Sequence, residues 1–175
     1  MNNSAEILDG RDERTVTMLY RKLGPAALSK TWHIVLRRDV AEEVVQETFA
    51  KMWKQGVQFD SLRSAYSWVY KTCTNAAVDY LRKKGHQEGV LVEGTSEEED
   101  REMSPVDRVA LGELMQLLIQ VLNKQESSYF ILQHVEGLQH GEIAEVLGVS
   151  RRTVLRLQQR VDKKLAKVRG ERDEK

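Results

Sequence analysis

LQHGEIAEVLGVSRRTVLRLQQRVDKKL, residues 138–165, is the stretch that decides the fold. It predicts two short helices joined by a tight turn. Ala144 is small enough to let the two helices cross closely, and Gly148 permits the left-handed backbone conformation of the turn. Val154 anchors the second helix. The other positions expected to be buried are apolar: Ile143, Leu147, Val149 and Leu157. This arrangement is typical of a helix-turn-helix.

The second helix of this motif begins with cations. Ser150 is a good N-cap, and the helix after it presents Arg151, Arg152 and Arg156. Arginine is the residue type that binds phosphates and guanine edges in the major groove. A plain helical hairpin has the same turn, and exposed arginines are often only solvated. The turn and the basic helix start together favour contact with duplex DNA over that structural alternative.

Composition bounds the class of protein. The chain has 175 residues, enough for one domain or two small ones, and it has only two prolines and 6% aromatic residues. Leu, Val, Glu, Lys and Arg are abundant, and no segment alternates as a strand would. The sequence therefore predicts an all-α protein.

Cysteine, histidine and hydropathy patterns exclude several functions. The single cysteine, Cys73, lies in an apolar helical stretch, so we expect a buried core residue in a reducing cytoplasm. The four histidines lack partners at ligand spacing, so no metal site and no cofactor is expected. No apolar run is long enough to span a membrane, and the polar N-terminus does not resemble a signal peptide. We expect a cytoplasmic protein without membrane insertion.

Charge is segregated along the chain although the formal net charge is zero. Residues 88–107 hold eight acidic residues and one basic residue, a net charge of −7. Residues 150–175 hold ten basic and four acidic residues, a net charge of +6. Local charge is what steers a protein to phosphate, so the basic end remains compatible with DNA binding.

Two helical domains are expected on either side of an acidic, flexible linker, with boundaries at residues 12–85, 86–105 and 106–169. In the first domain we expect helices over about 14–37, interrupted at Gly24-Pro25, then from an Asp39 cap, and then over about 64–84 with Gly85 as C-cap. In the second, a helix starts at Ser104-Pro105, and others follow near 125–135, 139–147 and 150–168.

The third helix of the first domain combines aromatic and basic residues. Tyr66, Trp68 and Tyr70 precede Lys71, Asn75 and the cluster at 82–84. Rings that stack on unpaired bases contribute about 1–3 kcal/mol per base, while cations follow the backbone of a single strand. Because the three rings are spaced by two, they cannot share one helix face. At least one of them belongs to the core, and Trp68 is the predicted one.

Three stretches of the chain form a recognisable combination: VVQETFAKMWK (44–54), FDSLRSAYSWVYKTCTNAAVDYLRKK (59–84) and VEGLQHGEIAEVLGVSRRTV (135–154). Together they resemble the extracytoplasmic-function (ECF) group of bacterial RNA polymerase sigma factors. Members of that group have two conserved domains, regions 2 and 4, joined by a variable linker. The resemblance covers about residues 19–84 and 114–168.

This resemblance implies three binding surfaces. The helix that would dock on the clamp coiled coil of the polymerase β′ subunit carries Asp39, Glu42, Glu43, Gln46, Glu47, Phe49 and Trp53. The surface that would melt the minus-ten promoter element and hold a flipped base carries Asp60, Ser61, Arg63, Tyr66, Trp68, Lys71, Asn75, Arg82, Lys83 and Lys84. The surface that would read the duplex minus-thirty-five element carries Ser150, Arg151, Arg152, Thr153, Arg156 and Arg160. The helices before it would face the β flap.

The implied partners are core RNA polymerase and promoter DNA, duplex and single-stranded, with an anti-sigma factor as regulator and no catalysis by this chain. Leu155 and Leu157 stand where relatives often have cations, which predicts a recognition helix that need not hold DNA unaided. Two alternatives stay open at this point. One is a conventional helix-turn-helix regulator that acts without polymerase, and the other is a sigma-like mimic that sequesters an anti-sigma factor.

Overall fold

The computed structural model describes residues 7–85 and 104–173, so the predicted acidic linker lies almost wholly outside the described residues. The N-terminal unit consists of α1 (Glu13–Val35), α2 (Arg38–Gln55) and α3 (Leu62–Gly85). The C-terminal unit consists of α4 (Pro105–Val121), α5 (Lys124–Phe130), η1 (Ile131–Val135), α6 (His140–Leu147) and α7 (Arg151–Asp173). The all-α prediction is confirmed. One short antiparallel pair, β1 (Leu8–Asp9) with β2 (Gln58–Phe59), is the exception that the sequence pattern did not indicate.

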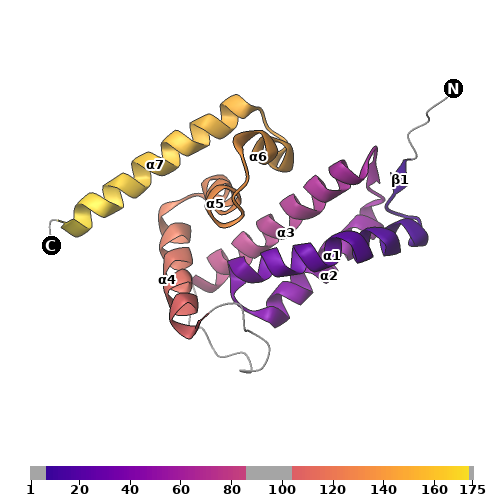
Figure 1. Ribbon diagram of the computed structural model, residues 1–175, viewed down its shortest axis with the longest axis horizontal. Coiled ribbons are helices and arrows are strands. Elements are labelled where there is room, and N and C mark those ends of the chain that lie inside the picture. Colours follow the sequence, from indigo (N-terminus) through magenta and orange to yellow (C-terminus); the bar gives the residue numbers. More distant parts are fainter. Residues whose placement is uncertain (1–6, 86–103, 174–175) are drawn as a thin grey trace.

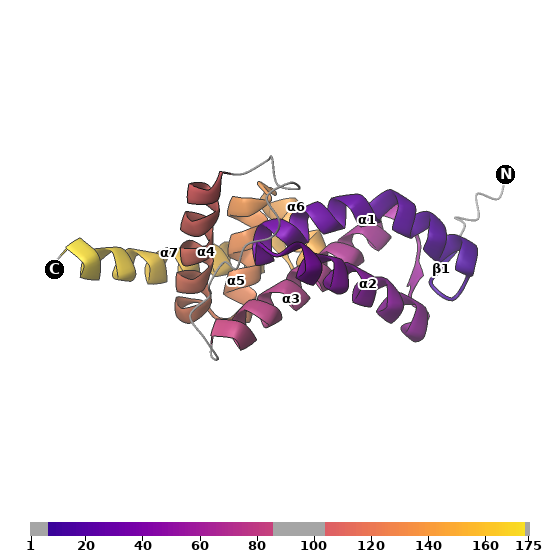
Figure 2. The ribbon, with the colours of Figure 1, turned by 90° about the horizontal axis from the view of Figure 1, so that it is seen from below.

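Helix α3 lies between the two units. It packs against α1 and α2 on one side and against α4, α5 and α6 on the other (Figure 1). The C-terminal helices are grouped at one end of the molecule, and the end of α7 projects beyond them in both views (Figures 1 and 2). The two units are therefore docked on each other through α3.

The first two helices differ from expectation in two places. The proline Pro25 does not interrupt α1, and its side chain is exposed. Leu23 and Ala27, on either side of it, are buried and hold the helix against the core. Asp39 is not the N-cap of α2, because the chain reverses at Leu36 (φ 56°) and Arg37 takes the cap position. The Arg37 guanidinium instead donates to Asp39 at 2.5 Å and holds the pKa of that carboxyl below its usual range.

Side-chain caps define the helix starts of the C-terminal unit. Ser104 caps α4 as predicted, accepting a hydrogen bond from the Asp107 N–H at 3.2 Å. Asn123 caps α5 in a capping box, in which its Oδ1 accepts from the Glu126 N–H and the Glu126 carboxylate accepts from the Asn123 N–H. The expected helix near 125–135 is thus an α-helix that continues as one π-helical turn.

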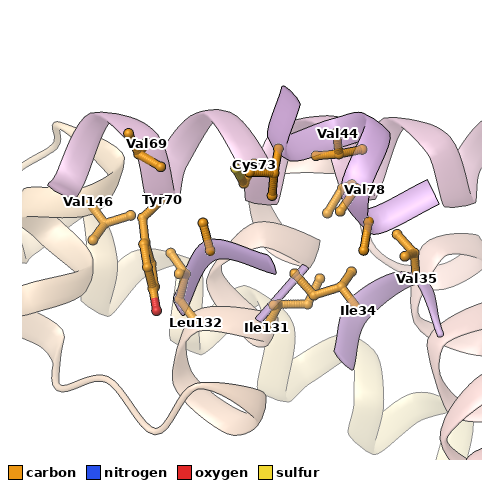
Figure 3. Packing of buried hydrophobic residues seen from close by; sticks show 14 of the residues in the cluster. Ile34, Val35, Val44, Val69, Tyr70, Cys73, Val78, Ile131, Leu132 and Val146 are labelled. Carbon is orange, nitrogen blue, oxygen red and sulfur yellow. The ribbon is translucent and has the colours of Figure 1, made fainter. Parts of the chain in front are cut away.

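The buried apolar residues of both units form one cluster. Figure 3 shows Tyr70 of α3 beside Val146 of α6 and Leu132 of η1. Cys73 is buried in the same cluster as a free thiol, which confirms its predicted core position. The aromatic core residue of α3 is Tyr70, 4% exposed, and not Trp68, which is only partly buried against Phe59. The docked C-terminal unit is what buries the Tyr70 side of α3.

Candidate nucleic-acid and polymerase interfaces

Helices α6 and α7 form the predicted helix-turn-helix. Gly148 caps α6 in the left-handed conformation (φ 66°), and its N–H reaches the carbonyls of Ala144 and Glu145. The Val149 N–H donates to the Ala144 carbonyl at 2.9 Å and closes the turn. Ile143 and Val154 are fully buried as predicted, whereas Leu147 and Val149 are only partly buried.

The outer face of α7 carries the predicted cations. The Ser150 hydroxyl accepts from the Thr153 N–H at 3.1 Å and lies 2.9 Å from the Thr153 hydroxyl, so both side chains serve the helix start. Four guanidinium groups are exposed, and none of them forms an ion pair within the described residues: Arg151, Arg152, Arg156 and Arg160. Leu155 is 47% exposed among them. Leu157 is 4% exposed, which confirms its predicted burial, so the cation expected to be missing from this face is not missing at position 157.

The outer face of α2 is acidic. The five polar residues predicted to meet the polymerase are all exposed: Asp39, Glu42, Glu43, Gln46 and Glu47. Trp53 is 44% exposed at the end of the helix. Phe49 is the exception, because it is buried edge-on against the Tyr20 ring at 5.0 Å between centroids. Phe49 therefore packs in the core beneath the acidic face of α2 and is not available for contact with a partner.

The segment before α3 is ordered by a carboxylate. Asp60 accepts hydrogen bonds from the Ser64 hydroxyl at 2.6 Å and the Ser61 hydroxyl at 2.9 Å. These hydrogen bonds hold the pKa of Asp60 below its usual range. Asp60, Ser61 and Arg63 line a shallow groove of about 430 Å³ whose other wall is the turn after α6.

Four of the predicted minus-ten residues make polar contacts with the C-terminal unit. Arg63 forms an ion pair with Glu145 at 2.7 Å, and Lys71 Nζ donates to the Leu147 carbonyl at 2.8 Å. Arg82 Nη1 donates to the Leu122 carbonyl at 2.9 Å. The Ser128 hydroxyl lies 3.4 Å from Asn75 Oδ1. The sequence does not indicate these contacts, since each one joins residues at least 40 positions apart.

The aromatic residues of α3 divide between the two sides of the helix. Tyr66 stacks on Tyr70 at 4.3 Å between ring centroids, on the side that faces the C-terminal unit. Trp68 lies outside this stack and lines two grooves, one of about 780 Å³ beside α2 and one of about 430 Å³ beside the end of α6. The two lysines at the end of α3 also differ in their surroundings. Lys83 is exposed, whereas Lys84 lies beside Gly112 and Met115 of α4.

The groove between α2 and α3 brings in two lysines that sequence reasoning missed. Lys51 and Lys54 line it together with Trp68, Lys71 and Asn75, and the carboxylates of Glu47 and Asp79 lie at the same groove. Their spacing of three places them on one face of α2, and this spacing is the signal that was available. Cations beside a partly exposed ring suit a nucleic-acid strand. The described residues contain no group of His, Cys, Asp and Glu side chains that could hold a metal ion. No described helix is long and apolar enough to cross a membrane.

Comparison with known proteins places both units. Residues 19–87 match the family model Sigma-70 region 2, and residues 112–165 match Sigma-70, region 4. The chain is 22% identical to the ECF RNA polymerase sigma-E factor of Haemophilus influenzae, over 88% of this chain and 89% of that one. It is 27% identical to the ECF RNA polymerase sigma factor SigW of Bacillus subtilis, over 86% and 80%.

Among solved structures the chain is similar to CnrH in complex with the cytosolic domain of CnrY. The TM-score is 0.52 at 18% identity, over 90% of this chain and 88% of that one, which is a likeness of fold. A region 2 unit followed by a helix-turn-helix region 4 unit defines a transcription initiation factor. The chain belongs to the sigma-70 family of RNA polymerase sigma factors, within its ECF group. It directs transcription initiation, with core RNA polymerase and promoter DNA as its partners.

Proposed function

We propose that three faces of this sigma factor divide the work of initiation. The acidic face of α2 binds the polymerase clamp, the α3 face with the segment before it binds the melted minus-ten element, and the start of α7 reads the duplex minus-thirty-five element. The observation that carries this proposal is the first half of α7, where four exposed guanidinium groups follow a helix-turn-helix turn and form no ion pair with the residues that the structure describes.

The role of α2 rests on charge and exposure. Its outer face offers five polar or acidic side chains and the half-exposed ring of Trp53, while Phe49 packs inward. An acidic surface with an aromatic edge suits a basic helical partner such as a clamp coiled coil. We assign Asp39, Glu42, Glu43, Gln46, Glu47 and Trp53 to this contact, and we omit Phe49.

The role of α3 rests on its cations and rings. Arg63, Lys71, Arg82, Lys83 and Lys84 supply positive charge along the helix, and Tyr66 and Trp68 offer partly exposed faces. Bases stack on such rings while cations follow the phosphates. Asp60, Ser61 and Asn75 add polar groups beside the same helix. We add Lys51 and Lys54 to this set because they line the groove in which Trp68 lies.

We further propose domain boundaries at 12–85 and 106–169, action in the cytoplasm, and no chemical step by this chain, since the polymerase carries out the chemistry. An anti-sigma factor is the proposed regulator. Its support is the fold likeness to CnrH, which is bound to a cytosolic domain of CnrY. A stand-alone helix-turn-helix regulator does not account for the region 2 match.

In vitro transcription with core polymerase tests the proposal. The wild-type chain should support promoter-dependent transcripts from fragments of the source genome. Arg151→Ala/Arg152→Ala should lose transcription from the same templates. Lys163→Ala, which removes an exposed cation about three turns further along the same helix, should retain it. A soluble wild-type chain that initiates on no template would refute the proposal, and would favour the mimic that only sequesters an anti-sigma factor.

A further inference from the structure

Helix α7 exposes one large apolar side chain near its start. Leu155 is 47% exposed, whereas Val154 and Leu157 on either side of it are buried. Among the described residues of α6 and α7, Leu155 is the one large apolar side chain that is exposed, and it does not belong to the apolar cluster of the core. Packing within the chain therefore does not account for a leucine at this position.

The neighbours of Leu155 on the helix surface are polar. Leu155 follows Arg151 by four residues and Arg152 by three, so the three side chains adjoin one another. Gln159 follows Leu155 by four residues and is exposed, and its amide forms no hydrogen bond within the part of the chain that the structure describes. A single exposed leucine is common on protein surfaces. This one, however, forms an uncharged pair with Gln159 inside a cationic surface.

The pair lies on the side of α7 that faces away from the core. Helical periodicity places four residues on the side opposite the buried Val154: Arg152, Leu155, Arg156 and Gln159. Arg151 and Arg160 lie nearer the edges of this surface. When a helix lies in the major groove, its outermost side chains reach the base edges and those at the edges reach the phosphates. Two of the four base-facing side chains are therefore not cations.

The chemistry of these two side chains selects particular groups on the bases. Leucine neither donates nor accepts a hydrogen bond, and the apolar group on the major-groove edge of a base pair is the C5-methyl group of thymine. The carboxamide of glutamine matches the N6 donor and the N7 acceptor of adenine. Four residues of a helix span about 6 Å and successive base pairs lie about 3.4 Å apart, so both contacts fall within about two base pairs.

A carboxylate marks the end of this surface. Asp162 is exposed and follows Leu155 by seven residues, which places it on the same side of α7 about two turns further along. A carboxylate repels the phosphates that line the groove. The segment of α7 that can enter the groove is therefore residues 151–160, and Leu155 lies in its middle.

We infer that Leu155 and Gln159 are specificity-determining residues of α7, Leu155 through contact with a thymine methyl group and Gln159 through hydrogen bonds to adenine N6 and N7. The inference rests on the proposed role of α7 in reading duplex DNA. The leucine then replaces charge, which binds any sequence, with a contact that depends on one methyl group. The duplex site has A·T pairs beside the bases that meet Arg152 and Arg156.

The experiment removes single groups from the DNA. The full-length chain in complex with core polymerase selects duplexes from a random-sequence library, and the most enriched duplex is resynthesised with one base changed at a time. Deoxyuridine replaces each thymidine in turn and lacks only the C5-methyl group, while 7-deazaadenine replaces each adenine and lacks the N7 acceptor. Affinities are measured for the wild type, Leu155→Ala, Gln159→Ala and Leu114→Ala. Leu114 is the matched control, since it is a leucine of α4 that is 42% exposed.

We expect deoxyuridine at one position to weaken wild-type binding by about fourfold, the value of one buried methyl group. This loss should vanish in Leu155→Ala and persist in Leu114→Ala. One 7-deazaadenine within two base pairs should weaken wild-type binding by about threefold or more, and Gln159→Ala should remove that sensitivity. If no deoxyuridine-sensitive position becomes insensitive in Leu155→Ala, the thymine contact is overturned. If every 7-deazaadenine effect persists in Gln159→Ala, the adenine contact is overturned.

Arg151→Ala/Arg152→Ala on the same duplex separates this inference from the proposed function. Binding that falls in this variant, but is indifferent to deoxyuridine and 7-deazaadenine in the wild type, leaves the duplex-reading role of α7 standing and refutes the inference. A selection that enriches no sequence, or one whose binding is indifferent to the loss of both arginines, refutes the duplex-reading role and the inference with it.

Discussion

The two proposed DNA surfaces of this sigma factor differ in what they touch within the chain. At the start of α7 four arginines stand in solvent, on a helix that the turn at Gly148 and the buried Val154 hold in place. Along α3, by contrast, Lys71 and Arg82 bind helix ends of the C-terminal unit and Arg63 binds a carboxylate. The comparison teaches that a basic residue in a nucleic-acid motif is available to DNA only if no group of its own chain holds it.

The largest effect should come from the apolar cluster that both units share. Leu132 is fully buried in it, and Leu132→Ala should lower the free energy of unfolding by about 2–5 kcal/mol. Urea unfolding followed by circular dichroism measures this. If the two units unfold together, as the contacts between them indicate, the unfolding curve should show a single transition that shifts as a whole to lower urea concentration. Two separate transitions, with only one of them shifted, would show that α3 and α7 sit on independently folding units.

The exposed surface is tested next. Arg151→Ala/Arg152→Ala should weaken duplex promoter binding by about 1–3 kcal/mol and reduce its salt dependence, without a change in thermal stability, because neither guanidinium forms an ion pair in the described structure. Fluorescence anisotropy over a salt series measures both quantities. Affinity equal to that of the wild type would remove duplex reading from the start of α7.

A smaller effect should come from the cap of α5, which supports both surfaces. The Asn123 side chain accepts from the Glu126 N–H at 3.0 Å, so Asn123→Ala should cost about 1 kcal/mol of unfolding free energy. Asn123→Asp is the matched control, since an aspartate keeps the capping oxygen. An equal loss in both variants would mean that the amide group, and not the cap, is what matters.

The smallest effect is a pH dependence in the same place. Burial alone would raise the pKa of Glu126, but hydrogen bonds from Lys164 and the Asn123 N–H outweigh it and hold that pKa below its usual range. The carboxylate therefore stabilises the fold fully above the ordinary glutamate value of about 4.3, and this contribution is lost as the pH falls through the lower folded-state value. Thermal unfolding between pH 6 and pH 3 should show the loss. Glu126→Gln should flatten the profile in that window, and an unaltered profile would exclude this residue as its source.

Local signals were sufficient where the determining residues are neighbours in the chain. The glycine turn, the Ser104 and Ser150 caps and the buried Val154 all depend on groups within a few residues, and the structure has each of them as predicted. The capping box at Asn123 and Glu126 was equally local, and the N-x-x-E pattern was its signal. The prediction that Asp39 caps α2 was wrong, because the chain turns at Leu36 and the cap position falls on Arg37.

Assignments that depended on facing surfaces came out differently. Two-residue spacing showed that Tyr66, Trp68 and Tyr70 could not share a face, but it could not say which face the C-terminal unit would cover, and Tyr70 proved to be the buried ring. In the same way Phe49, which was assigned to the polymerase surface, belongs to the core, because Tyr20 of α1 packs against it. Sequence periodicity shows which residues share a face of a helix, but it does not show which other element packs against that face.

By itself the sequence determined the helical class, the helix-turn-helix and the sigma family, and it supplied the sets of residues proposed for the binding surfaces. Only the tertiary structure decided that α3 lies between the two units, with Lys71 and Arg82 on the ends of helices from the other unit. The physical reason is range. Caps, turns and periodicity act over three to five residues, whereas the choice between a carbonyl and a phosphate for a cation depends on residues about 40 to 80 positions away, which meet only in the folded chain.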